Sequence, residues 1–145
     1  MKLEDIQDEW QKDGEISSPN IANESMKFAK LHSKYWRMLS HERLLLRKQE
    51  SDLKTLRFDK YEFYTQGASK EHLEKGWTKV PKGAILKSEV GIYLESDQHI
   101  QEQILKIAYQ NEKVDFLLSV VDTINKRSYL LKTMLDYQKF ANGIG

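Results

Sequence analysis

The chain has 145 residues, of which 39% are hydrophobic and 31% charged, and its formal net charge is +1. This length suits one domain with a core of its own. Cysteine is absent, which excludes disulfides, thiol catalysis and zinc-thiolate sites. The start of the chain is acidic from Glu4 and has no apolar run, so it is no signal peptide, and no window approaches the ~20 apolar residues that span a bilayer. We therefore expect a soluble, intracellular protein.

Charge is distributed unevenly along the chain. Residues 1–24 hold two lysines and seven acids, a net charge of -5, whereas residues 25–60 hold ten Lys and Arg and four acids, a net charge of +6. The basic middle is therefore the region with an electrostatic bias toward polyanions. An acidic head over residues 1–16 can mask that region or contact a basic partner.

A long helix is predicted over residues 18–64. Ser18 is the expected N-cap and Pro19 the expected first helical residue, and no further Pro or Gly occurs before Gly67. Such a helix would be roughly 65–70 Å long, so it must bend or pack on other chains. Apolar residues recur at steps of three and four at Phe28, Leu31, Tyr35 and Met38, then move to Leu39, Leu46 and Leu53, and again to Leu56, so the register shifts along the helix.

A connection over residues 65–95 joins this helix to a C-terminal helix over residues 96–142. Turn residues at 65–69 and a loop-like stretch at 76–83 frame a short amphipathic piece, and residues 84–94 suit a short helix or a strand. Ser96 and Asp97 are expected to cap the last helix, and apolar residues recur along it at steps of three, four and seven. The predicted fold is all-α: a single helical domain of long helices with a short connecting helix.

The residue pattern contains no recognisable active site. His32 and His41 are nine apart, which places them on opposite sides of a helix, and His72 and His99 are expected as solvated surface histidines. The acids of the head are expected on a solvated helix face rather than around a hard cation. The sequence also has no glycine-rich phosphate loop. It therefore predicts a binding protein with no cofactor and no metal, not an enzyme.

The segment over residues 54–67 combines cations with aromatic rings. Lys54, Arg57, Tyr61 and Tyr64 share one helical face, with Lys60 beside them. Single-stranded nucleic acids are bound by this combination, because cations follow the phosphates and bases stack on flat rings. The alternative is that these aromatics are core or subunit-contact residues with lysines around them. Upstream, Lys27, Lys30, Lys34 and Arg37 form a second basic stripe beside Tyr35 and Trp36, which is predicted as a solvated face.

Three segments resemble the UvsY family, the recombination mediator proteins of T4-like phages. Residues 1–9, MKLEDIQDE, are similar to the family's M-[RK]-L-E-D-[LI]-Q-x-E start, and residues 62–67, EFYTQG, resemble the end of its basic stretch, D-Y-Y-S-G. The C-terminal run is similar in order and spacing to the family's last helix, at residues 113–117, 125–127 and 136–143. Three matches in the same order are more specific than any one of them.

The resemblance implies a homo-oligomeric ring of six or seven subunits that binds single-stranded DNA in the cytoplasm of the host cell. It implies as partners a phage RecA-like recombinase and the single-strand-binding protein that the recombinase replaces on the DNA. The family's DNA motif has two basic residues two positions apart; Lys60 falls on the second, but Phe58 falls on the first, so Arg57 with Lys60 is the expected pair. The resemblance also implies that the C-terminal helix holds the ring together, and the residues expected there are Val114, Leu117, Leu118, Val121, Ile124, Leu131 and Leu135.

Two other interpretations stay open. One is a structural helical-bundle or coiled-coil adaptor or scaffold protein without DNA affinity, in which the basic face pairs with the acidic head of a neighbouring subunit. The other places the basic, aromatic helix on an anionic membrane surface. The membrane interpretation is the less favoured of the two, because acids interrupt the basic stripe and the aromatic residues are not collected on one wide apolar face.

Overall fold

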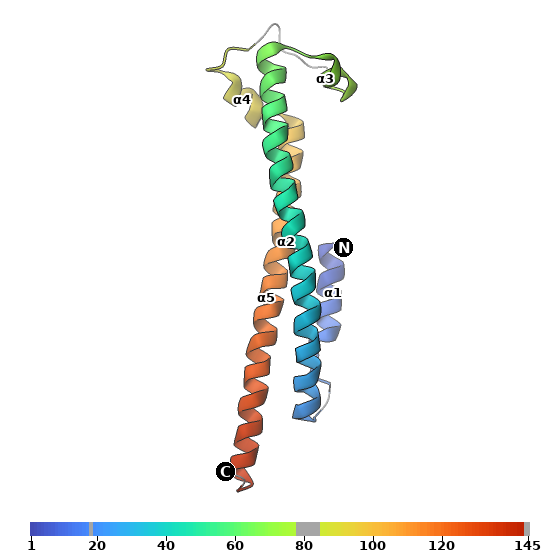
Figure 1. Ribbon diagram of the computed structural model, residues 1–145, viewed down its shortest axis with the longest axis vertical. Coiled ribbons are helices and arrows are strands. Elements are labelled where there is room, and N and C mark those ends of the chain that lie inside the picture. Colours follow the sequence, from blue (N-terminus) through green and yellow to red (C-terminus); the bar gives the residue numbers. More distant parts are fainter. Residues whose placement is uncertain (18, 78–84, 144–145) are drawn as a thin grey trace. The chain divides into compact units, whose positions relative to one another are not determined.

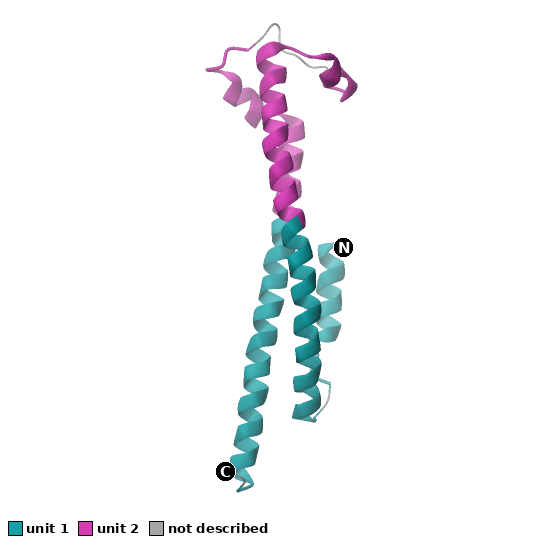
Figure 2. Ribbon diagram, viewed as in Figure 1, with its two compact units in different colours: residues 1–44, 110–145 teal, residues 45–109 magenta. Residues whose placement is uncertain are grey.

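The structure is a computed structural model that describes residues 1–17, 19–77 and 85–143. Within these ranges the regular elements are all helices: α1 (Leu3–Asp13), α2 (Ile21–Gln66), α3 (Lys70–Glu74), α4 (Val90–Glu95) and α5 (Gln98–Ala141) (Figure 1). The all-α prediction is confirmed for these residues. The chain forms two compact units, residues 1–44 with 110–145 and residues 45–109 (Figure 2), and α2 and α5 contribute to both.

The ends of the long helices follow local rules that the sequence carries. The carboxylate of Asp97 accepts a hydrogen bond from the Ile100 amide at 3.0 Å and so caps α5, as predicted. At its other end α2 stops before Gly67, whose φ of 86° lies in the left-handed region that favours glycine. The start of α2 differs from the prediction: the side chain of Asn20 accepts from the Asn23 amide at 3.2 Å, the helix begins at Ile21, and Pro19 precedes it. The predicted cap Ser18 lies outside the described residues.

Unit 1 packs α1 against the first part of α2 and the second part of α5. Trp10 of α1 meets the ring of Tyr35 of α2 edge to face, with ring centroids 5.4 Å apart, and the guanidinium of Arg127 of α5 lies 5.4 Å from the Trp10 ring. The core of this unit includes Ile6, Phe28, Leu39, Leu117 and Ile124, all fully buried. The acidic head is therefore a helix that completes this core, which the charge pattern alone did not reveal.

Acidic residues of α1 also neutralise part of the basic stripe of α2. The ammonium of Lys34 lies 2.6 Å from the Asp13 carboxylate and 3.4 Å from that of Glu9. Burial alone would raise the pKa of Asp13, but hydrogen bonds from Lys34 and Tyr35 outweigh it and hold the pKa below its usual value. The head thus contacts two cations of the stripe within the subunit, since Lys27 also donates to the Glu15 carbonyl.

Unit 2 has an aromatic core. Phe63 and Tyr64 near the end of α2 pack with Trp77 and Val90, and the partly buried residues around them are Leu56, Tyr61, Ile85 and Leu94. The segment over residues 90–95 is helical, so the helix interpretation holds for the described part of residues 84–94. His72 is buried, which corrects its prediction as a surface histidine: its Nδ1 accepts from the Ser69 amide at 3.1 Å in the cap of α3, and its ring stacks on Trp77.

Candidate nucleic-acid interface

Cations and one aromatic ring of the predicted DNA-binding segment lie on the exposed surface of α2 in unit 2. Lys54 and Arg57 are both exposed, and Phe58 is 61% exposed. Tyr61 is half-buried and packs against the aromatic core. These residues offer positive charge and flat rings on the surface of one helix, which is the chemistry that contacts the phosphates and bases of a single strand.

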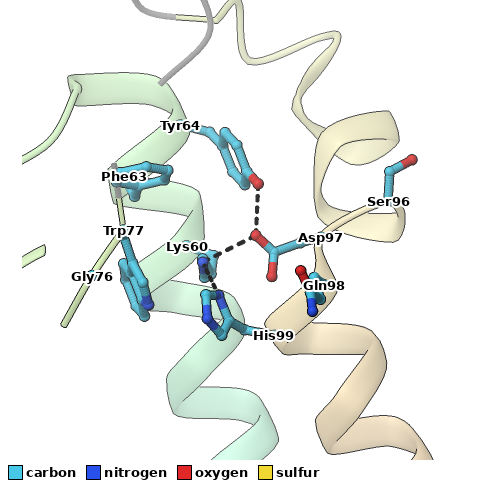
Figure 3. A pocket seen from close by; sticks show the side chains of 9 residues that line it. All are labelled: Lys60, Phe63, Tyr64, Gly76, Trp77, Ser96, Asp97, Gln98 and His99. Atoms are coloured by element: carbon cyan, nitrogen blue, oxygen red, sulfur yellow. Dashed lines mark hydrogen bonds and ion pairs between the residues drawn. The ribbon is translucent and has the colours of Figure 1, made fainter. Parts of the chain in front are cut away.

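Lys60, three residues after Arg57, is buried instead. Its side chain is 3% exposed, and its ammonium lies 3.1 Å from the Asp97 carboxylate and 4.0 Å from the centre of the Trp77 ring. Figure 3 shows this ammonium enclosed between Asp97, His99 and Trp77. A buried ammonium with this many partners is held in one position, because removing it from its carboxylate would leave an unpaired buried charge.

His99 completes the set of partners around Lys60. The Lys60 ammonium and Nδ1 of His99 are 2.8 Å apart. Since an ammonium has hydrogens and no acceptor, Nδ1 accepts and the imidazole carries its own hydrogen on Nε2. Asp97 and His99, at the start of α5, therefore tie the end of α2 to the next long helix of the same unit.

Tyr64 belongs to the same network. Its hydroxyl donates to the Asp97 carboxylate at 2.6 Å, and burial together with this hydrogen bond raises the pKa of Tyr64 well above its ordinary value. Burial alone would raise the pKa of Asp97 as well, but hydrogen bonds from Tyr64, the Ile100 amide and Lys60 outweigh it, so the pKa of Asp97 is lowered. A cavity of about 500 Å³ lies beside these groups (Figure 3).

Comparison with known proteins identifies the family. The family model for "Recombination, repair and ssDNA binding protein UvsY" matches residues 9–144. The chain belongs to the UvsY family. A comparison with curated protein sequences gives no match.

Solved structures of the UvsY fold are similar over nearly the whole chain. One crystal structure of the bacteriophage T4 recombination mediator protein UvsY, in lattice type IV, superposes with a TM-score of 0.79 at 21% identity and covers 97% of this chain and 99% of that chain. A second, in lattice type II, superposes with a TM-score of 0.79 at 24% identity and covers 98% of each chain. The resemblance drawn from three short segments is thus confirmed, and the likeness extends over the fold.

The structure divides the five DNA-binding residues expected for this UvsY family member into two groups. Lys54, Arg57 and Tyr61 have accessible surface, whereas Lys60 and Tyr64 are buried with their polar atoms bonded inside unit 2. Direct DNA contact by any of the five stays a prediction. Sequence reasoning missed Phe58 as an exposed ring and Asp97, His99 and Trp77 as partners of Lys60. The exposure of Phe58 could have been predicted from its position in the family's basic motif, where a basic residue is expected. The partners of Lys60 could not have been predicted, because they lie far along the chain.

The seven residues expected to hold a ring together lie on α5 in unit 1. Val114, Leu117, Val121, Ile124 and Leu131 are buried within the subunit, Leu135 is half-buried, and Leu118 is 38% exposed. Helical periodicity identifies an apolar face but does not say which element packs against that face. Here α1 and α2 of the same chain pack with α5 in unit 1. Besides Leu118, the large apolar side chains that stay exposed on α5 in this unit are Tyr129, Leu130, Met134, Tyr137 and Phe140.

The described residues also show how the chain stands with respect to metal sites and membrane-spanning helices. No group of three or more His, Asp and Glu residues there has the arrangement of a metal site. None of the helices in those ranges is both long enough and apolar enough to cross a membrane.

Proposed function

We propose that this protein is a recombination mediator that binds single-stranded DNA without sequence specificity as a homo-oligomer. The observation that carries the proposal is the exposed pair of cations Lys54 and Arg57 beside the exposed ring of Phe58, in a chain of the UvsY family. Phosphates would lie along the two cations, and bases would stack on Phe58 and the accessible part of Tyr61. No chemical step is required of the protein in this role.

In this proposal Lys60 and Tyr64 act from inside unit 2. Their bonds to Asp97 keep the end of α2 in place, so that Arg57 and Phe58 are presented on a rigid helix rather than on a frayed end. A preformed surface loses less conformational entropy when the strand binds. Lys60 would thus be a positioning residue for the DNA contact rather than a phosphate ligand.

The oligomer follows from the size of one site. A single site with two exposed cations would bind weakly, but identical sites on six or seven subunits would engage one strand, so that each further contact becomes effectively intramolecular. The exposed apolar residues of α5, from Tyr129 to Phe140, together with Leu118 and Leu135, are the proposed subunit contact. Such a ring would present the strand in a shape on which a recombinase can nucleate.

The proposed partners are a phage RecA-like recombinase and the single-strand-binding protein that it replaces, in the cytoplasm of the host cell. The processes served would be DNA recombination, repair and recombination-dependent replication. The family description, which names recombination, repair and single-stranded DNA binding, supports this assignment.

Fluorescence anisotropy of a labelled oligothymidylate at several salt concentrations tests the proposal, with light scattering to measure the mass of the protein. We expect tight binding that weakens with salt, with a slope of about -0.7 for each phosphate neutralised by the protein. A well-formed oligomer that leaves the anisotropy unchanged at low salt would favour a structural adaptor instead. Addition of recombinase and single-strand-binding protein to the bound strand then tests the loading step.

A further inference from the structure

A second group of planar side chains lies on α2 in unit 1. The rings of His32 and Trp36, one helical turn apart, are nearly parallel, with an interplanar angle of 6° and centroids 6.3 Å apart. The guanidinium of Arg43 lies 5.9 Å from the centre of the same Trp36 ring. Three flat groups therefore lie next to one another on the surface of α2, with the Trp36 ring in contact distance of both others.

Trp36 differs from the other two tryptophans of the chain in its exposure. It is 48% exposed, whereas Trp77 is 6% exposed and Trp10 is packed against Tyr35 and Arg127 in unit 1. An exposed indole with a cation at its face is not needed to fill either core. Its flat surface remains available to another planar group, such as a nucleobase, and stacking of this kind does not depend on base identity.

The charges that α2 itself carries around this group are nearly all positive, although Glu9 and Asp13 of α1 pair with Lys34. Between residues 25 and 44, Glu42 is the single acid of the sequence, and it is buried with its carboxylate 3.3 Å from the Lys113 ammonium. Lys30 and Arg37 are exposed on the same segment of α2. The charges that this segment of α2 exposes are thus mainly cationic. They attract a polyanion and repel a cationic partner.

We propose that His32, Trp36 and Arg43 form a second contact for single-stranded DNA, separate from the one at Lys54 and Arg57. Bases stack on the Trp36 and His32 rings, and Arg43 and Arg37 bind the phosphates on either side. This inference rests on the proposed function, since it adds a site for the same ligand. It predicts that each subunit binds a longer stretch of strand than the contact in unit 2 alone would occupy.

Intrinsic fluorescence gives a direct test, because Trp36 is the most exposed indole of the three. Unlabelled oligothymidylate should quench the emission of the wild-type protein, and Trp36→Phe should abolish most of that quenching while keeping a ring for stacking. In the anisotropy assay Trp36→Ala should weaken binding roughly five- to 100-fold. Leu44→Ala is the matched control, since Leu44 is 66% exposed on the same helix and unit; it should change affinity less than twofold.

Three outcomes would overturn the inference. If Trp36→Ala binds as tightly as the wild type while Arg57→Ala is weakened, this second contact is absent and the proposed function stands. If Trp36→Ala lowers the mass measured by light scattering, the indole is a subunit contact instead. If the wild-type oligomer binds no oligothymidylate at all, both the proposed function and this inference fail.

Discussion

Two cation–tryptophan pairs show how one kind of contact serves different purposes in the two units. In unit 2 the ammonium of Lys60 lies 4.0 Å from the centre of the Trp77 ring, and both side chains are buried. In unit 1 the guanidinium of Arg43 lies 5.9 Å from the Trp36 ring, which stays half in solvent. The buried pair is held by an ion pair to Asp97 and stabilises the fold, whereas the exposed pair leaves about half of the indole surface accessible. Burial, not residue type, separates a structural contact from one that is open to a ligand.

The largest expected difference is in the free energy of unfolding when each of the two tryptophan rings is removed in turn. Trp77→Ala should lower the free energy of unfolding by roughly 3–5 kcal/mol, because it leaves a cavity in the aromatic core of unit 2. Trp36→Ala should change it by no more than about 0.5 kcal/mol, as is usual for surface substitutions. Urea denaturation followed by circular dichroism measures both. Equal losses in the two variants would break the comparison.

Neutralising the carboxylate that holds Lys60 should have a smaller effect. Asp97→Asn keeps an N-cap oxygen for α5 but removes the charge opposite Lys60, so we expect a loss of roughly 1.5–3 kcal/mol in the free energy of unfolding. Asp122→Asn is the control, because Asp122 pairs with Lys126 at 2.8 Å on the exposed surface of α5. Its loss should be much smaller, because solvent screens an exposed pair, and a loss as large as that of Asp97→Asn would contradict the argument from burial.

The salt dependence of DNA binding separates Arg57 from Lys60, which lie one helical turn apart. Arg57→Ala should reduce the slope of log affinity against log salt by about 0.7, the contribution of one phosphate on a single strand. Lys60→Met should leave the slope unchanged, although it should destabilise unit 2, because its ammonium is already paired with Asp97. A reduced slope in Lys60→Met, measured at a temperature where the variant is folded, would mean that Lys60 leaves this pair to contact a phosphate.

The smallest effect concerns acid stability. The pKa of Asp97 is lower in the folded chain than the value of about 3.9 expected when unfolded, so its contribution is complete above that value and is lost as the pH falls through the folded pKa. The free energy of unfolding should therefore fall less steeply below pH ~4 in Asp97→Asn than in the wild type. Parallel curves from urea denaturation at a series of pH values would show that Asp97 does not supply this dependence. Asp13, whose pKa is also lowered, sustains the remaining slope in both proteins.

The sequence by itself determined the helices and the chemical character of the basic, aromatic segment. Steps of three and four, the cap at Asp97 and the stop before Gly67 are local features, and local hydrogen bonding and side-chain spacing decide them. Three short segments were enough to indicate the family. A helix face was expected for the acidic head, but its packing into the core was missed, because its charge pattern looked like a solvated surface and Trp10 packs against residues far along the chain.

Only the tertiary structure decided which members of the basic, aromatic segment are accessible. Lys60 and Arg57 look alike in the sequence. Only Lys60 is enclosed, because the carboxylate of Asp97 and the ring of Trp77, from later parts of the chain, pack against its ammonium. The same holds for the apolar face of α5, where burial of Leu117 and Ile124 leaves the side chains from Tyr129 onward on the surface. A pattern along one helix marks the residues that can be buried. Which of them are buried depends on segments that meet only when the chain folds.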